Sequence, residues 1–325
     1  MADTWYVLGD SRMAAAMIAC LSLSITCILI TIEYQELRHE LYFIDFFDDL
    51  KYNRIRYPLN RLNYEKFVNR FDFITKYIMN QMFWISSISV ISMLPVSLFL
   101  VYLKGDITHL KPLYLIFWSI IAVIFCLQIF GSLWFGAVLW YASTYYLKLK
   151  FNEVYYKMVS LEKSRNLFSS VALVMTFKEH NYLMKITEDF NHLFKFVIFY
   201  FYFIATPGFQ IGVYGTHHSA THLFVRIFGV FIFIISFTNV LVMNYMNVWI
   251  CKTSKKPYSV LFSFISRSKT PIPLENRMKI NSFIEHLSGH EIGFYCYDLF
   301  PMNYYEFYQY IYIFGLNYIL IMNLF

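Results

Sequence analysis

The chain has 325 residues, of which 58% are hydrophobic and only 15% are charged, and its formal net charge is +6. A soluble domain carries about 45–50% apolar and about 25% charged residues, whereas here the apolar residues form blocks long enough to cross a bilayer. The composition excludes an ordinary soluble domain and indicates a polytopic membrane protein. We interpret the excess of basic residues as a signal of membrane topology and not of nucleic-acid binding, so we expect no nucleic-acid partner.

A hydrocarbon core about 30 Å thick requires about 20 apolar residues in a helix. The first such stretch reads "MAAAMIACLSLSITCILITI". A cleaved signal peptide is the alternative here, but the stretch is long for one, no small-residue cleavage site follows, and Asp3 and Asp10 precede it. Six predicted spans result: Met13–Ile32, Met82–Leu103, Leu113–Ala142, Phe196–Tyr214, Leu223–Ile250 and Tyr305–Phe325.

The long segments between these spans are basic. Segments 33–81, 143–195 and 251–304 hold eight, eight and seven of the 27 Lys and Arg residues. The positive-inside rule places such segments in the cytoplasm. We therefore expect a multi-pass protein of the plasma membrane with both chain termini outside.

The first cytoplasmic segment has a helical pattern. In "YQELRHELYFIDFFDDLKY", Leu37, Leu41, Ile44 and Phe47 recur at helical spacing, with charged residues on the other face. Two interpretations stay open for such a stretch: an interfacial helix lying on lipid, or a helix packed in a bundle beneath the membrane.

The later cytoplasmic segments are also predicted to be helical. No Pro or Gly occurs from residue 143 to residue 196, so we expect the third span to continue as a helix below the membrane. The stretch "KTPIPLE", with Pro271 and Pro273, breaks the helical pattern and predicts a loop. The predicted fold is an all-α transmembrane bundle, one domain over residues 1–325, whose long helices extend into a cytoplasmic anchor.

No pattern typical of an enzyme or a metal site occurs in the sequence. The five cysteines show no CxxC or Cys/His spacing. Walker A, HExxH and GxSxG motifs are missing. We expect no catalytic residue, no bound metal and no cofactor.

The order of these elements resembles the arthropod gustatory and odorant receptor superfamily, which has seven spans, a cytoplasmic anchor of long helices, and a last helix split into a cytoplasmic and a membrane piece. The family signature near the end of that helix is Thr-Tyr, five apolar residues, then Gln-Phe. Here Tyr318 and Phe325 match it, while Asn317 replaces Thr and Leu324 replaces Gln. The segments "HLSGHEIGFYCYDLFPMNYYEF" and "EHNYLMKITEDFN" resemble the family's split helix and its approach to the fifth span.

Counted back from the end, the six spans correspond to the family's second to seventh. We therefore expect either a shortened member or a sequence from which an upstream exon is missing. The resemblance implies a ligand-gated, non-selective cation channel in sensory perception of taste, assembled as a homo- or hetero-tetramer.

The resemblance also implies that the last helix lines the pore. Asn317, Ile321 and Leu324 fall at i, i+4 and i+7, on one stripe of a helix, and Phe325 follows at the expected outer mouth. A polar ring with an apolar constriction suits a pore that closes by dewetting. The alternative is that these residues only pack against neighbouring spans.

For the ligand, the resemblance implies a cavity between the outer halves of the spans, suited to a small tastant or odorant-like molecule. The candidates there are aromatic: Phe99, Tyr102, Tyr114, Trp118, Phe228 and Phe231. Apolar walls of this kind bind organic ligands, but aromatic side chains also face membrane lipid. A secondary transporter is a competing class, although internal repeats and mid-span carboxylates are missing. A G-protein-coupled receptor would need an inner tail after seven spans.

Overall fold

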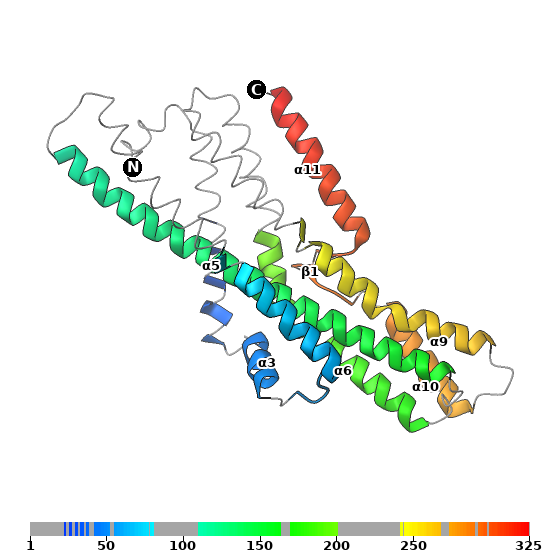
Figure 1. Cartoon of the computed structure of the whole chain (residues 1–325). Coiled ribbons are helices and arrows are strands. Elements are labelled where there is room, and N and C mark those ends of the chain that lie inside the picture. The colour runs from blue at the N-terminus through cyan, green and yellow to red at the C-terminus, as the bar shows by residue number, and fades with distance from the viewer. Residues whose placement is uncertain are drawn as a thin grey trace.

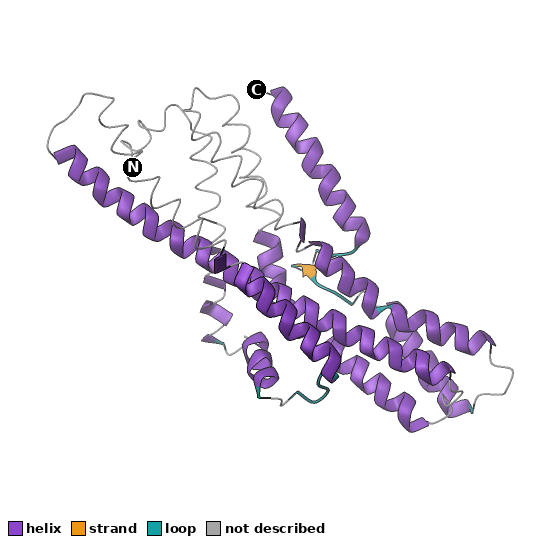
Figure 2. Ribbon diagram, viewed as in Figure 1, coloured by secondary structure: helices purple, strands orange, loops and turns teal. Residues whose placement is uncertain are grey.

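The computed structural model describes a subset of the chain, and helices dominate it (Figure 2). The described residues are 23, 26–27, 30–31, 33–35, 37–38, 42–52, 55–77, 79–80, 110–163, 170–200, 241–242, 244–267, 273–289, 292–297 and 299–324. The elements are α3 (Tyr42–Lys51), α5 (Leu110–Lys163), α6 (Ser170–Tyr200), α9 (Lys256–Arg267), α10 (Leu274–Gly289), β1 (Tyr295–Cys296), β2 (Phe300–Pro301) and α11 (Tyr304–Leu324). Residues 61–77 and 244–254 are also helical.

Helix α5 is the longest described element and runs the length of the molecule (Figure 1). It has 54 residues, which is about 81 Å at 1.5 Å per residue. It passes through residues 142 and 143 without a break, so the predicted continuation of the third span as a helix is confirmed. Pro112 lies in its first turn, where proline is tolerated.

Helix α6 packs on the second half of α5. Its buried apolar side chains recur every three or four residues except between Phe177 and Leu183, where the buried His180 fills the interval, so the strip facing α5 is continuous. They are Leu173, Phe177, Leu183, Ile186, Phe190, Phe194 and Ile198. Val154, Phe151 and Leu147 on α5 are fully buried opposite them. Two helices with complementary apolar strips therefore form the centre of the described core.

The segment after the first predicted span packs on this pair of helices rather than lying free. The Phe46 ring meets the rings of Tyr146 and Phe190 edge to face, with centroids 4.9 Å and 5.0 Å apart. The bundle interpretation holds for this segment, but the predicted apolar face is partly wrong. Leu37 is 82% exposed, and Phe46 is the buried residue instead of its neighbour Phe47. Residue 38 is in a turn, so the helical face is not continuous across it.

Helices α9 and α10 form the far end of the described core (Figure 1). Helix α9 ends at Arg267 and α10 begins at Leu274, so the break predicted around Pro271 and Pro273 is confirmed. Helix α10 buries Ile280, Phe283 and Leu287 at spacings of three and four. Helix α9 packs against both α5 and α10.

The predicted spans are only partly covered by the described residues. Span 82–103 lies outside them, and spans 13–32, 196–214 and 223–250 lie largely outside. Within the part of the chain that the structure describes, no helix has both the length and the apolar character needed to cross a membrane. The six spans and the outer position of both termini remain predictions.

Candidate functional site

A short β-hairpin connects α10 to the last helix and forms the base of the candidate site. Strand β1 pairs antiparallel with β2, with Tyr295 opposite Pro301 and Cys296 opposite Phe300. Tyr297 turns the chain in the left-handed region, with φ of 53°. The backbone N–H of Met302 donates to the carbonyl of Phe294 over 2.8 Å, which closes the hairpin.

The hairpin is docked into the helical core. Phe294 is fully buried, and its ring centroid lies 5.4 Å from that of Trp140 on α5 and 5.5 Å from that of Phe194 on α6. The N–H of Tyr295 donates to the Asn191 Oδ1 over 2.8 Å, and the N–H of Tyr297 donates to the carbonyl of Lys195 over 3.1 Å. Apolar burial and hydrogen bonds together fix the hairpin on α6.

Cys296 belongs to the same buried layer. Its side chain is fully buried, and burial raises the pKa of its thiol to about 12. The thiolate is the reactive form of cysteine, so this thiol stays neutral and acts as a small apolar side chain.

Helix α11 starts directly from the hairpin with a side-chain cap. The Asn303 Oδ1 accepts the backbone N–H of Glu306 over 3.0 Å, and the Asn303 carbonyl accepts the N–H of Phe307. Asparagine is among the best N-cap residues, and an acidic residue in the first turn suits the helix dipole. The helix start is thus fixed by local chemistry and by the docked hairpin below it.

Above its start, α11 rises away from the other described helices (Figure 1). Large side chains stay exposed around it, including Tyr305, Tyr308, Tyr312, Ile313 and Ile319, while Tyr310 is buried. Exposed apolar surface on this scale indicates a helix that is covered by another chain or by lipid.

The predicted pore residues belong to this helix. Asn317, Ile321 and Leu324 lie within α11, and so does Tyr318, so the helical geometry that their spacing requires is present. Phe325 lies outside the described residues. The inward stripe itself remains a prediction.

Only two of the six predicted ligand residues lie within the described part of the chain. Phe99, Tyr102, Phe228 and Phe231 lie outside the described residues. Tyr114 and Trp118 lie in the first turns of α5. The shared cavity is therefore still a prediction.

A buried ionic cluster that the sequence pattern did not predict joins three helical segments. The Lys150 ammonium lies 2.9 Å from Glu153 and 2.7 Å from Glu179, and it donates to the Pro58 carbonyl over 2.8 Å. Lys157 lies 2.6 Å from the other oxygen of Glu179. The only signal in the sequence was the i, i+3 spacing of Lys150 and Glu153.

This cluster is well compensated. The Glu153 carboxylate also accepts the N–H of Asn60 and the side-chain amide of Asn63, at 2.9 Å and 2.7 Å. Burial raises the pKa of Glu179, but the ammonium groups of Lys150 and Lys157 offset this, so the net pKa lies below its ordinary value. Satisfied charges of this kind fix the register of the segments that they join.

His180 is a buried histidine of the core. Its Nε2 lies 3.1 Å from the Ser254 carbonyl, so this nitrogen carries the proton and donates. Its ring meets Phe151 and Phe283 edge to face. Burial lowers its pKa to about 4, so the ring is neutral at neutral pH.

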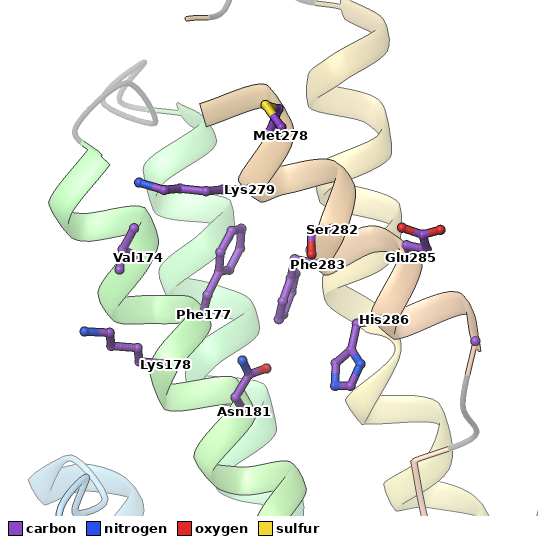
Figure 3. A pocket seen from close by; sticks show the side chains of 11 residues that line it. Val174, Phe177, Lys178, Asn181, Met278, Lys279, Ser282, Phe283, Glu285 and His286 are labelled. Carbon is purple, nitrogen blue, oxygen red and sulfur yellow. The ribbon is translucent and has the colours of Figure 1, made fainter. Parts of the chain in front are cut away.

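An open groove of about 890 Å³ runs between α6 and α10, and His286 is among the residues that line it (Figure 3). Its floor is the stacked pair Phe177 and Phe283, with ring centroids 4.1 Å apart. Lys178 and Lys279 lie at its edge. The groove is open along its length, so it lacks the enclosure of an organic-ligand pocket.

Comparisons with known proteins relate this chain to one class of protein through its structure and not through its sequence. No model of a protein family matches the chain, and no curated protein sequence matches it. In structure, however, the chain is similar to the insect olfactory receptor OR5 from Machilis hrabei, solved in complex with eugenol. The TM-score is 0.66 at 8% sequence identity, over 97% of this chain and 82% of the receptor.

This likeness establishes the fold. The chain has the fold of an insect olfactory receptor, and the resemblance to the arthropod receptor superfamily is confirmed at that level. The solved protein with this fold is a receptor and not an enzyme, in agreement with the missing catalytic motifs. The separation of α10 from α11 by a hairpin also matches the split last helix that the resemblance implied.

Proposed function

We propose that this protein is a gustatory-receptor-like chemoreceptor subunit and forms a ligand-gated, non-selective cation channel. The observation that carries the proposal is the whole-chain likeness to an olfactory receptor, together with a last helix that starts on a docked hairpin and exposes its apolar side chains. The protein would be a multi-pass protein of the plasma membrane, and four copies, identical or mixed with a partner subunit, would surround one axis.

In this proposal α11 lines the pore. Asn317 supplies a polar ring, and Ile321, Leu324 and Phe325 form an apolar constriction near the outer mouth. A narrow apolar ring blocks ions by dewetting, and a small outward tilt of each helix wets it. Leu324 in the family's Gln position makes this constriction drier.

A ligand would act through the upper part of the molecule while the base of α11 stays fixed. Phe294 holds the hairpin against Trp140 and Phe194, so motion of α11 would pivot at Asn303. The core of α5 and α6 with its buried ionic cluster would act as the rigid cytoplasmic anchor.

The ligand would be a small organic molecule. Eugenol, the ligand of the solved receptor, is one such molecule. Aromatic residues suit an apolar molecule with few polar groups, and the candidates are Phe99, Tyr102, Tyr114, Trp118, Phe228 and Phe231.

Whole-cell recording tests the proposal. Cells that express the chain, alone or with a full-length partner receptor, should show a cation current when a panel of small organic ligands is applied. Leu324→Gln should raise the basal current, because a polar side chain weakens the apolar constriction. Ile319→Gln is the matched control, since residue 319 lies on the opposite face of the helix and is exposed in α11.

Two results would contradict the proposal. Substrate uptake without ligand-evoked current would favour a secondary transporter. Tag labelling that places residue 325 in the cytosol would remove the pore assignment, because the last helix would then run in the opposite direction.

A further inference from the structure

A second, smaller pocket lies between residues 30–38 and the C-terminal part of α6, and neither the ligand cavity nor the pore uses it. Its volume is about 400 Å³. Ile30 and Phe196 form its apolar part, and each lies at the cytoplasmic end of a predicted span. Arg38, His192 and Lys195 form its basic part. The pocket therefore combines basic groups with apolar side chains at the expected inner boundary of the membrane.

Gln35 supplies a specific polar group in this pocket. Its side chain is only 3% exposed, and its Nε2 donates to the His192 carbonyl over 3.1 Å. That carbonyl only accepts hydrogen bonds, so the amide nitrogen must face it and the orientation of the amide is fixed. Among the described residues, none donates to the Gln35 Oε1. A buried acceptor without a donor is costly, so a ligand with a donor group is favoured here.

The two features define the chemistry of a ligand. Arg38 and Lys195 favour a phosphate, which accepts charge-assisted hydrogen bonds. The donor for the Gln35 Oε1 is better a hydroxyl than an ammonium group, because the neighbouring cations repel an ammonium. A phosphate next to several hydroxyl groups is the headgroup chemistry of an inositol phospholipid.

The apolar side chains of the pocket favour a lipid over a soluble phosphate as the ligand. Ile30 is exposed and Phe196 is half-buried, and both continue into segments that the sequence predicts to be within the membrane. A soluble sugar phosphate gains nothing from this surface, whereas the acyl chains of a lipid cover it. Basic groups at the cytoplasmic boundary also meet the anionic leaflet of the membrane.

We propose that this pocket binds the headgroup of a phosphoinositide from the inner leaflet. The inference rests on the proposed membrane placement of the chain. It also concerns the last helix, because the backbone carbonyl of Lys195 accepts the N–H of Tyr297 in the hairpin, and the Lys195 ammonium lies 5.4 Å from the centre of the Tyr297 ring. A phosphate at Lys195 would therefore act on the connection that carries α11.

Binding to the purified full chain in detergent tests the inference. The probe is a fluorescent short-chain phosphatidylinositol bisphosphate, followed by anisotropy. We expect saturable binding that weakens roughly thirtyfold in the Arg38→Ala, Lys195→Gln double variant, at about 1 kcal/mol for each basic group. Gln35→Met, which keeps the side-chain length but removes the acceptor, should weaken binding by about fivefold. Arg61→Ala is the control, because this side chain is 94% exposed on the helix of residues 61–77.

Each remaining outcome overturns the inference. Equal affinity of the double variant and the wild type would mean that the basic groups do not bind the lipid. If short-chain phosphatidylserine displaced the probe as well as unlabelled phosphatidylinositol bisphosphate does, the inositol hydroxyl groups would have no role in binding. Competition by soluble inositol trisphosphate or inorganic phosphate as strong as that of the lipid would make this a site for a soluble anion. No current is needed in this assay, so a chain that binds lipid without conducting refutes only the channel.

Discussion

Replacing Lys150 with methionine tests the interpretation of the core as a rigid anchor. The substitution keeps the length of the side chain and removes its charge. Lys150 is only 1% exposed and Glu153 and Glu179 are 5% and 6% exposed, so the two carboxylates cannot turn to solvent without moving the helices.

The expected loss of stability depends on the contacts that Glu153 and Glu179 keep when Lys150 is replaced. Glu179 retains Lys157, whose side chain is half exposed, while Glu153 retains only the N–H of Asn60 and the amide of Asn63. Removing one member of a buried ion pair costs about 3–5 kcal/mol. At roughly 2 °C per kcal/mol for a large domain, the midpoint of thermal unfolding should fall by about 6–10 °C.

The measurement is thermal unfolding of the detergent-purified chain, followed by loss of the monodisperse peak in size-exclusion chromatography. Lys76→Met is the matched control, because it breaks the Lys76–Asp72 pair, in which both side chains are mostly exposed. Exposed pairs contribute only about 0–1 kcal/mol. Adding Glu153→Gln to the Lys150 variant should recover part of the loss, since the carboxylate that is left without a cation is then removed. Equal unfolding midpoints for Lys150→Met and Lys76→Met would refute the reasoning.

Two further predictions concern the same core. His180 has a folded-state pKa of about 4 against 6.5 when unfolded, so the unfolded chain binds the proton first and stability should fall by about 3 kcal/mol as the pH drops from 6.5 to 4. His180→Phe should flatten that part of the stability–pH curve, and an unchanged curve in this variant would contradict the assignment. His286→Phe, at an exposed site, should change the curve only slightly, because burial and not the charge of His286 is the main cause of the lowered pKa of His180. Phe294→Ala should destabilise the chain by about 3–5 kcal/mol and reduce ligand-evoked current at matched surface expression, because the hairpin loses its anchor. Phe262→Ala, at an exposed position of α9, should change neither reading, and equal effects of the two would mean that the hairpin is not an anchor.

The last helix combines a fixed base with unpartnered faces. Its start is capped by Asn303 and rests on a hairpin that is bonded to Asn191 and Lys195 of α6. Tyr308, Tyr312, Ile313 and Ile319 above that base are exposed in the described part of the chain. Exposed apolar faces of this kind support the proposal that the helix packs against other subunits around a shared pore.

Much of the helical architecture could be predicted from the sequence. The absence of Pro and Gly after residue 143 predicted the long course of α5 and α6, and Pro271 with Pro273 predicted the break before α10. Tyr318 and its neighbours pointed to the receptor fold before any comparison. These features are local, because helix continuation and helix breaking depend on backbone chemistry within a few residues.

Only the tertiary structure decided which side chains are buried together. The sequence pattern placed Leu37 and Phe47 on one apolar face, yet Leu37 is exposed, and Phe46 meets Tyr146 and Phe190 in the core. Lys150, a basic residue in a basic segment, reads as a solvated charge until Glu179 is placed beside it from 29 positions along the chain. Helical periodicity defines a face, but contacts between segments far apart in the chain determine whether that face meets solvent, lipid or another helix.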